Sequence, residues 1–587
     1  MKKARVVCLI LIATILFSAS SLGAARGDGE TIFERIKREH EWIKKYNHKP
    51  IASAAGFALQ ATNAEHQSID VKHYRLQIAL TPEPASIAGT VTINAEASAT
   101  VDSISIDASD NLVIDGVRVD GSAQEFQRKQ SRIVINFSQT FSAGRAFTIA
   151  VQYHGVPVTS GLLGGGMLVS KHGSNNTTVM ANLSEPYAAP TWWPCVDDAT
   201  DKATVEVEAT VPENFRAASN GVLEKVEANA NHTVTYFWRE DAPLATYLVS
   251  VAAADYVTFE DSYTAMDGTR MPIVYYVYPE HEAKARQKFA VTRDAIEIFA
   301  PLFGEYPFVK EKYGMAEFSW SGGMEHQTMT SLGASIIGSE RSSGQGVIAH
   351  ELAHQWWGDF VTMKSWRDIW LNEGFASYAE VLFFERYLNL DAGQLMSESY
   401  DDGKLDGQLG GTVTAENLDN PFDDRGAIYD KGAWVLHMLR HILGDERFFA
   451  ALKEYARRFA FGNAATADFQ HVCEQFYGGS LEWFFQQWIY APGRPVYKIS
   501  TEISPPDAQG NYAVKLTIKQ KQSHTIPGRQ ERVYIMPLDV TVHYADGSSE
   551  IRAVWNDSRR QSFTFTASKR PVDIGVDEGR WVLKKLK

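Results

Sequence analysis

The pattern of hydrophobic positions changes along the chain and separates regions of different secondary structure. From about residue 69 to 255, apolar and polar residues alternate in short runs such as YRLQIAL and ATVEVEATV, with Gly, Asp, Asn and Pro between the runs. This alternation predicts a mostly antiparallel β domain. From about 256 to 494 the apolar runs lengthen and take helical spacing, as in GAWVLHMLRHILG, which predicts a mixed α/β domain. Alternation returns over 495–587 and predicts a small C-terminal β domain.

The start of the chain has a different pattern, with a basic beginning, an apolar run of 14 residues and a stretch of small residues. This layout predicts a secretory signal peptide over residues 1–25. A membrane anchor is the alternative, but 14 apolar residues fall short of the roughly 20 that a spanning helix needs. We therefore expect an exported protein, periplasmic or secreted, with no stable membrane span in the mature chain. Residues 26–68 predict a short amphipathic helix followed by a linker.

Composition and charge limit the partners that the protein can have. The chain has 587 residues, 44% of them hydrophobic, so it can form several cores. Its formal net charge is −14, and such a surface repels nucleic acid and anionic membranes. Beyond the predicted signal peptide, Cys195 and Cys473 lie in different predicted domains, so we expect no disulfide framework. No feature of the sequence indicates an oligomeric state.

The stretch GVIAHELAHQWWGDF contains candidate metal ligands. His350 and His354 are four residues apart, so on a helix both imidazoles leave the same face and can bind one cation. Glu351 is turned by about 100° and can reach a water on that cation. Glu373, near the start of the next predicted helix, is the candidate third ligand, and Glu380 on the same helical face is a candidate partner of a ligand. Two imidazoles and one carboxylate leave one position of a tetrahedral zinc open, which is typical of catalytic zinc; the alternative is two partly buried core histidines.

Four motifs stand in one order along the chain: TWWPCVDDATDKATVEVEATVP, SGGMEH, HELAHQWWGD with WLNEGFASY, and AIYDKGAWVL. Together they resemble the zinc aminopeptidase family of the aminopeptidase N and leukotriene hydrolase type, which are gluzincin metallopeptidases. The resemblance covers most of the chain and implies a multidomain α+β fold. An N-terminal antiparallel β domain, a thermolysin-like α/β catalytic domain with one Zn²⁺ per chain, and a small C-terminal β-sandwich domain are expected.

The chain departs from the family pattern in three places. His326 stands where the family motif has Asn, which affects the expected geometry of the substrate edge. The family's Asp-Glu-Pro after the cysteine is Asp197, Asp198 and Ala199 here, a change that we interpret as structural. The family's large helical C-terminal domain is missing, so we expect a more open active-site cleft.

The motif SGGMEH indicates which bond is cut. Gly322 and Gly323 carry no side chain, so a peptide can approach the backbone beside Met324 as an added strand. Taken alone, these residues also fit a glycine turn beside a surface glutamate. By resemblance, Glu325 binds the free α-ammonium of the substrate and Glu185 matches a second carboxylate with the same purpose. Anchoring the N-terminus there leaves only the first peptide bond over the zinc, which implies an aminopeptidase acting on short peptides.

The resemblance also assigns the chemical steps. Zinc polarises the carbonyl and lowers the pKa of its water toward about 7, while Glu351 takes the proton as general base and later delivers it to the leaving amine. Tyr429 matches the family's tyrosine and stabilises the oxyanion, although alone it also fits a core tyrosine at a helix start. Two other functions stay open: an epoxide hydrolase-type activity at the same zinc site, and a catalytically inactive peptide-binding protein. The preferred N-terminal residue is not indicated.

Overall fold

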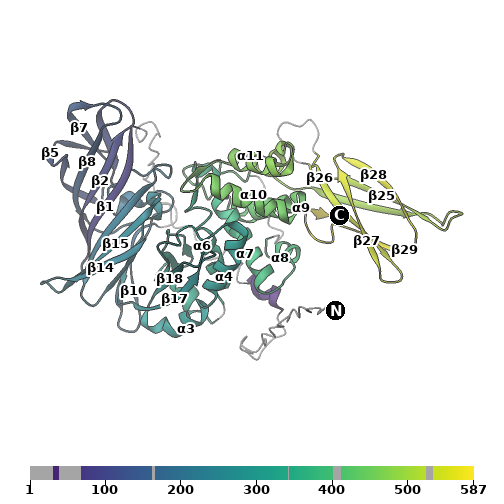
Figure 1. Ribbon diagram of the computed structural model, residues 1–587, viewed down its shortest axis with the longest axis horizontal. Coiled ribbons are helices and arrows are strands. Elements are labelled where there is room, and N and C mark those ends of the chain that lie inside the picture. Colours follow the sequence, from purple (N-terminus) through teal and green to yellow (C-terminus); the bar gives the residue numbers. More distant parts are fainter. Residues whose placement is uncertain (1–30, 39–67, 161–164, 341–342, 401–411, 524–532) are drawn as a thin grey trace, which may run out of the picture.

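The computed structural model describes residues 31–38, 68–160, 165–340, 343–400, 412–523 and 533–587. β-sheets from the first part of the chain lie at one end, helices fill the middle, and the C-terminal strands form the other end (Figure 1). The predicted signal peptide lies outside the described residues and stays a prediction. Of the predicted N-terminal helix, residues 32–38 are described; they are helical, and Ile36 packs into the main hydrophobic core.

The first part of the chain consists of three sheets, in each of which some neighbouring strands are far apart in sequence. The eight-stranded sheet has the order β14-β15-β12-β1-β2-β8-β4-β5. Its strands are β1 (Ile69–Pro82), β2 (Ala85–Ala97), β4 (Leu112–Val119), β5 (Ser122–Gln124), β8 (Ala146–Gly155), β12 (Ala203–Pro212), β14 (Val222–Ala228) and β15 (Thr233–Leu244). The second sheet, β13-β16-β11-β10-β9, contains β9 (Thr159–Ser160), β10 (Gly165–His172), β11 (Thr177–Leu183), β13 (Arg216–Ser219) and β16 (Val251–Ala254). The third, β3-β7-β6, contains β3 (Val101–Asp107), β6 (Phe126–Lys129) and β7 (Arg132–Phe141).

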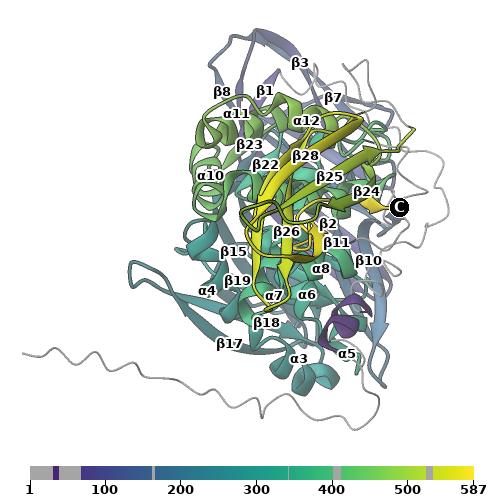
Figure 2. The ribbon, with the colours of Figure 1, turned by 90° about the vertical axis from the view of Figure 1, so that its right-hand side faces the viewer.

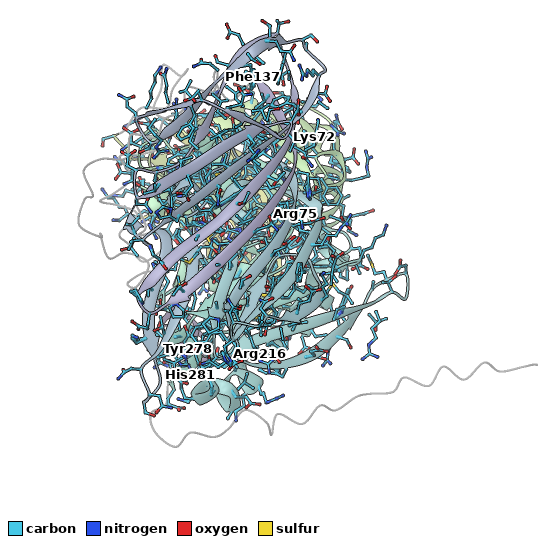
Figure 3. All side chains as sticks on the ribbon, turned by 90° about the vertical axis from the view of Figure 1, so that its left-hand side faces the viewer. Lys72, Arg75, Phe137, Arg216, Tyr278 and His281 are labelled. Carbon is cyan, nitrogen blue, oxygen red and sulfur yellow. The ribbon has the colours of Figure 1, made fainter. Side chains whose placement is uncertain are left out.

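Buried and exposed residues alternate along the strands, so each sheet has a buried face and a solvent-exposed face, as the sequence pattern predicts. Along β12 every second residue is buried. On β1 the buried Leu76 lies between the exposed polar residues Arg75 and Gln77, and Lys72 and Arg75 lie on the outward face that Figure 3 shows. One pairing differs from the antiparallel expectation, because β1 runs parallel to β12.

The middle of the chain builds a mixed sheet with the order β17-β18-β19-β21-β20. Its strands are β17 (Val257–Thr264), β18 (Arg270–Val277), β19 (Tyr313–Phe318), β20 (Gly323–Met324) and β21 (Thr330–Gly333). The helices are α3 (Glu282–Lys288), α4 (Val291–Phe303), α5 (Ala334–Gly338), α6 (Gln345–Ala353), α7 (Trp370–Tyr387), α8 (Ala392–Ser399), α9 (Gly432–Leu443), α10 (Asp445–Arg458), α11 (Thr466–Tyr477) and α12 (Glu482–Trp488). A two-stranded sheet of β22 (Val361–Met363) and β23 (Gly462–Ala464) joins distant parts of this region.

Helix α7 lies at the centre of this region and is buried on all sides from Trp370 to Phe384. A helix without a solvent-exposed face packs inside a large core, and its polar side chains need hydrogen-bond or charged partners within that core. Glu373 and Glu380 are both on this buried stretch. Both carboxylates therefore need partners inside the protein.

The last part of the chain forms two facing sheets, β28-β25-β24-β30 and β27-β26-β29 (Figure 2). The strands are β24 (Val496–Ile503), β25 (Tyr512–Gln520), β26 (Met536–Tyr544), β27 (Ser549–Asn556), β28 (Arg560–Ala567), β29 (Pro571–Val576) and β30 (Lys585–Leu586). Val514 of one sheet and Val542 of the other share a core. Trp581 stacks on the rings of His437 and His441 on α9, at centroid distances of 4.6 and 5.0 Å, and attaches this part to the helices.

The two cysteines of the described chain, Cys195 and Cys473, are both buried and free. Among the described residues, no helix combines the length and apolar character needed to cross a bilayer. The predicted domain boundaries near residues 255 and 494 fall between β16 and β17 and between α12 and β24; as limits of domains they stay a prediction.

Candidate active site

Helix α6 presents both predicted histidine ligands on one side. The helix ends at Ala353, but His354 keeps a right-handed helical backbone (φ −59°, ψ −24°), and its N–H donates to the His350 carbonyl at 3.3 Å. The two imidazole rings therefore lie one turn apart, with centroids separated by 4.8 Å. Sequence spacing predicts this arrangement, although the helix ends at Ala353, before the end of the apolar run that predicts it.

Helix α7 supplies the third group. Glu373 Oε2 lies 3.2 Å from His350 Nε2 and 3.4 Å from His354 Nε2. The opposite ring nitrogens are held in place: His350 Nδ1 lies 2.8 Å from Glu380 Oε1, and His354 Nδ1 lies 2.9 Å from the carbonyl oxygen of Trp357. These contacts hold an N–H on each Nδ1, so that in the neutral rings Nε2 is the atom available to bind a cation beside Glu373.

The three ligand atoms of His350, His354 and Glu373 lie within 4.8 Å of one another. Two imidazole nitrogens and one carboxylate oxygen form the donor set of catalytic zinc, and the fixed Nδ1 atoms are the usual outer partners of zinc histidines. Burial alone lowers the pKa of His350, but its contacts with Glu373 and Glu380 outweigh burial and raise that pKa well above its usual value, because these anionic partners stabilise a positive charge. The donor set itself fits a zinc ion.

Two further carboxylates meet the metal ligands from the opposite side. Glu325 directly follows β20, and Glu185 lies just beyond β11. Oxygen atoms of Glu185, Glu325 and Glu373 lie within 4.8 Å of one another. Both Glu185 and Glu325 are buried, at 6% and 2% exposure, and the Oε1 atom of each has no hydrogen-bond partner in the described part of the chain.

Unpaired buried carboxylate oxygens are costly, so their presence together points to an absent donor. Burial, reinforced by the charge of Glu325, raises the pKa of Glu185 well above its usual value. Burial also raises the pKa of Glu325, against the opposing charge of His354. A cationic group that enters between the two carboxylates would satisfy both oxygens and reverse these shifts.

Strand β20 contributes backbone to the same site. It pairs with β21 through Gly323 opposite Leu332 and Met324 opposite Ser331, and no described strand pairs with its other edge. The Gly322 carbonyl accepts the N–H of Gly333 at 2.8 Å. SGGMEH is thus an edge strand leading to a buried glutamate, instead of a turn beside a surface glutamate.

The glycine at position 323 leaves room for the carboxylate of Glu351 in its observed position. A Cβ atom there would lie 2.3 Å from Cδ of Glu351, closer than any side chain can approach. Glu351 is itself buried, and burial raises its pKa to about 8 although His350 opposes this. The glycine therefore allows the backbone of β20 to lie directly against Glu351.

Tyr429 lies at the same site, on the short π-helical segment Gly426–Lys431 that precedes α9. Its ring is parallel to that of His350, with centroids 6.1 Å apart and an interplanar angle of 11°. Burial and the charge of Glu373 raise the pKa of Tyr429 well above its usual value, so its hydroxyl stays protonated and can donate a hydrogen bond. A π-helical turn inside helical structure is frequent at functional sites.

The sequence analysis did not identify two groups that belong to the candidate site, the Arg425 side chain and the Trp357 carbonyl. Arg425 lies four residues before Tyr429, and its positive charge opposes the raised pKa values of Tyr429 and Glu185. Its helical spacing from Tyr429 is the signal that could have identified it. The Trp357 carbonyl that holds His354 is backbone, and no sequence signal marks it.

Two family models match the chain. Residues 288–488 match the Peptidase family M1 domain, and residues 70–248 match the Peptidase M1 N-terminal domain. The chain belongs to peptidase family M1. This confirms the family that the four motifs resemble, and a zinc ion is what the M1 zinc metallopeptidases imply for the His350, His354 and Glu373 cluster.

M1 relatives share part of their length with this chain. Glutamyl aminopeptidase of Sus scrofa is 27% identical over 410 residues, which cover 67% of this chain and 42% of that protein. A probable aminopeptidase 2 of Sulfurisphaera tokodaii is 27% identical over 466 residues, 76% of this chain and 54% of that protein. The chain thus spans about half the length of the curated relatives that it matches.

Solved structures share the M1 fold of this chain. A structure of the M1 zinc metallopeptidase of Deinococcus radiodurans superposes with a TM-score of 0.62 at 24% identity, over 72% of this chain and 94% of that one. Legionella pneumophila aminopeptidase A, solved with aspartic acid, gives a TM-score of 0.71 at 18% identity, over 89% of this chain and 60% of that one. These likenesses support the multidomain α+β architecture.

Proposed function

We propose that this M1 chain is a zinc-dependent aminopeptidase that releases N-terminal residues from short peptides. The observation that carries the proposal is the meeting of two clusters at Glu373. One cluster contains the metal ligands, and the other contains the buried carboxylates Glu185 and Glu325. A peptide whose α-ammonium binds between these carboxylates has its first peptide bond beside the metal position.

One zinc ion per chain would be held by His350, His354 and Glu373. When bound, zinc supplies Lewis-acid polarisation of the scissile carbonyl and lowers the pKa of water at the site. Residues of the chain orient the ligands, bind the substrate and transfer the proton. The Nδ1 contacts of the two histidines to Glu380 and to the Trp357 carbonyl keep their Nε2 atoms available for the ion.

Substrate binding follows from the acidic pair and the strand edge. The α-ammonium donates hydrogen bonds to Glu325 and Glu185, whose Oε1 atoms have no other partner among the described residues. The substrate backbone lies along the open edge of β20, against Gly322, Gly323 and Met324, as an added strand. These contacts leave room for one residue before the scissile bond.

Proton transfer is assigned to Glu351. Its carboxylate lies against the backbone of Gly323, where the substrate edge begins. From there it takes a proton from the attacking water and returns it to the leaving amine. The hydroxyl of Tyr429, protonated at all physiological pH values, donates to the oxyanion that forms at the carbonyl.

The acidic pair argues against the two alternatives. An epoxide offers no donor to the unpaired oxygens of Glu185 and Glu325, whereas an ammonium group satisfies both. A peptide-binding protein without activity has no use for Glu351 and Tyr429 beside the metal ligands. For the location, we keep export as a proposal that rests on the N-terminal pattern alone.

A panel of aminoacyl fluorogenic substrates tests the proposal. Each substrate is assayed with the protein as purified, after o-phenanthroline, and after zinc is added back, and elemental analysis measures the metal. We expect about one zinc per chain, cleavage of some members of the panel, loss of cleavage with chelator, and recovery with zinc. Chelator-resistant cleavage, or no cleavage by zinc-loaded protein across the panel, would contradict the proposal.

A further inference from the structure

The two carboxylates of the proposed amine site come from different parts of the molecule. Glu185 follows β11 in the N-terminal β-sheets, whereas Glu325 follows β20 in the sheet beneath the helices. The distance between them therefore depends on how these two parts are joined. The loop of residues 325–329, which we call the anchor loop, connects β20 to β21 and is buried along its whole length.

His326 makes the first of two sets of contacts, called ties below, that join the anchor loop to the N-terminal β-sheets. Its Nδ1 lies 2.9 Å from Ser331 Oγ, and its Nε2 lies 3.4 Å from Nδ2 of Asn182 on β11. The Asn182 amide nitrogen also donates to the Val249 carbonyl at 2.8 Å, so its contact with His326 Nε2 is the longest of its contacts; an unprotonated Nε2 suits this donor and leaves the Nδ1–H to donate to Ser331. Burial lowers the pKa of His326 to about 3, so the ring is neutral and this tautomer is consistent. Asn182 Nδ2 also lies 3.1 Å from the hydroxyl of Ser184, the residue before Glu185.

The second tie is formed by Gln327 and Thr328 together. Gln327 Nε2 donates to Glu240 Oε1 at 3.1 Å, and Thr328 Oγ1 donates to Glu240 Oε2 at 2.7 Å. The N–H of Gly221 donates back to Thr328 Oγ1 at 2.7 Å, and the Asn220 side chain donates to the Gln327 carbonyl at 2.6 Å. Consecutive residues of the loop thus bind both carboxylate oxygens of one buried glutamate.

The close approach at this tie depends on backbone conformations that are unusual. Thr328 has φ +59°, which a β-branched residue rarely adopts and which must be held by its surroundings. Gly221 has φ +70°, and a Cβ there would lie 1.9 Å from the carbonyl oxygen of Arg239. Strain of this kind persists where the surrounding contacts fix the geometry.

The same threonine is also tied to the metal helix. Its N–H donates to Gln355 Oε1 at 2.9 Å, and Gln355 is the residue after His354. The ammonium group of the buried Lys312 donates to the Thr328 carbonyl at 3.0 Å. Thr328 therefore contacts the N-terminal β-sheets, the metal-ligand segment and the strand next to the site.

We propose that His326, Gln327 and Thr328 are positioning residues that hold the Glu325 carboxylate beside Glu185 and thereby set the affinity for the α-ammonium of the substrate. This inference rests on the proposed function, in which that pair binds the amine. The His326 imidazole spans from Ser331 to Asn182, so both ends of the tie lie within a few residues of an anchor carboxylate. A purely structural role for these bonds would stabilise the interface without affecting ammonium recognition.

The test compares two metal-binding inhibitors of the zinc-loaded protein, leucine hydroxamate and its des-amino analogue isocaproyl hydroxamate. Both bind the metal through the same group, and only the first carries the ammonium, so the ratio of their Ki values reports the amine site alone. Thr328→Val keeps the side-chain shape and removes the hydroxyl. In this variant we expect the Ki of leucine hydroxamate to rise by about tenfold, because the charge-assisted hydrogen bond between its ammonium group and Glu325 is weakened. The Ki of isocaproyl hydroxamate should stay unchanged. His326→Leu should reduce the ratio in the same direction.

Two control variants separate positioning from stability. Thr328→Ser keeps the hydroxyl and should keep the ratio within about threefold of that of the unmodified protein. Asn463→Ala removes a bond between the N-terminal part and a different sheet of the middle region, from Asn463 Nδ2 on β23 to the Ala199 carbonyl at 2.9 Å, and should lower the melting temperature without changing the ratio. An unchanged ratio in folded Thr328→Val and His326→Leu proteins would overturn the inference. A ratio near one in the unmodified protein would instead contradict the proposed function itself.

Discussion

The two halves of the candidate site are built in different ways. The metal half comes from α6 and α7, two helices that pack together, and its ligands lie within 23 residues of one another in sequence. The amine half brings together Glu185 and Glu325, about 140 residues apart, from two different sheets. A local helical repeat can specify the first half, whereas the second depends on how large parts of the fold are joined.

The halves also differ in how completely their polar groups are satisfied. On the metal side, the Nδ1 atoms of His350 and His354 are paired with Glu380 and with the Trp357 carbonyl. On the amine side, Glu185 and Glu325 each keep one buried oxygen without a partner in the described chain. The histidines are thus oriented by the protein, whereas in the proposed function the substrate amine would complete the amine half.

The largest effect should come from Glu351→Gln, which removes proton transfer and leaves both halves intact. We expect kcat to fall by about 10⁴-fold, the upper end for general acid–base catalysis, because Glu351 acts in both directions of transfer. Zinc content by elemental analysis and leucine hydroxamate binding should stay near those of the unmodified protein. A zinc-loaded variant that retains a tenth of the original turnover would remove Glu351 from this role.

Tyr429→Phe separates the metal half from the oxyanion donor beside it. The ring and its packing on His350 stay, while the hydroxyl is lost, so kcat and kcat/KM should fall together by about 10² to 10³ with KM nearly constant. Tyr236→Phe is the matched control, because its buried hydroxyl donates to the Phe215 carbonyl at 3.2 Å in the N-terminal β-sheets, away from the proposed chemistry. The control should lower stability and leave kinetics near normal; the same kinetic pattern for Tyr429→Phe would place Tyr429 in the core.

Glu380→Gln tests the support of the metal half. Losing the carboxylate that orients His350 Nδ1 should weaken zinc affinity by about 10- to 100-fold. Competition with a chelator of known affinity measures this directly, and saturating zinc should restore most of the activity. If zinc affinity is unchanged, the contact between Glu380 and His350 has no part in holding the ion.

Glu325→Ala acts on the amine half and should have a smaller effect. Removing one charge-assisted partner of the ammonium, worth about 1.5 to 3 kcal/mol, should lower kcat/KM by about tenfold or more while zinc content stays unchanged. Glu185→Ala should give a loss of the same kind. Full activity of both variants on substrates with a free amine would show that the ammonium binds elsewhere.

The difference between the halves also explains what the sequence could predict. The spacing of His350 and His354 and the position of Glu373 at the start of α7 predict the metal cluster, because a helix converts spacing into direction. Alternation of apolar residues likewise predicts the strands of both β regions. Both patterns involve residues close together in sequence, so they can be interpreted without knowledge of the fold.

Features that depend on distant contacts were not predictable from the residues. The family resemblance, and not the spacing, indicated Glu185 as a partner of Glu325. The parallel pairing of β1 with β12 joins strands far apart in the chain, and alternation alone carries no strand direction. His326 was recognisable only as a departure from a motif, because its partner Asn182 lies on another sheet.

The central claim is that both halves act on one substrate, and a pair of peptides tests it most directly. kcat/KM is measured for a short peptide with a free N-terminus and for the same peptide acetylated at that amine. Acetylation removes the charge that Glu185 and Glu325 would bind, so we expect a loss of at least about 100-fold. Comparable cleavage of the two peptides, or cleavage at an internal bond, would contradict the account by showing that the acidic pair does not fix the N-terminus.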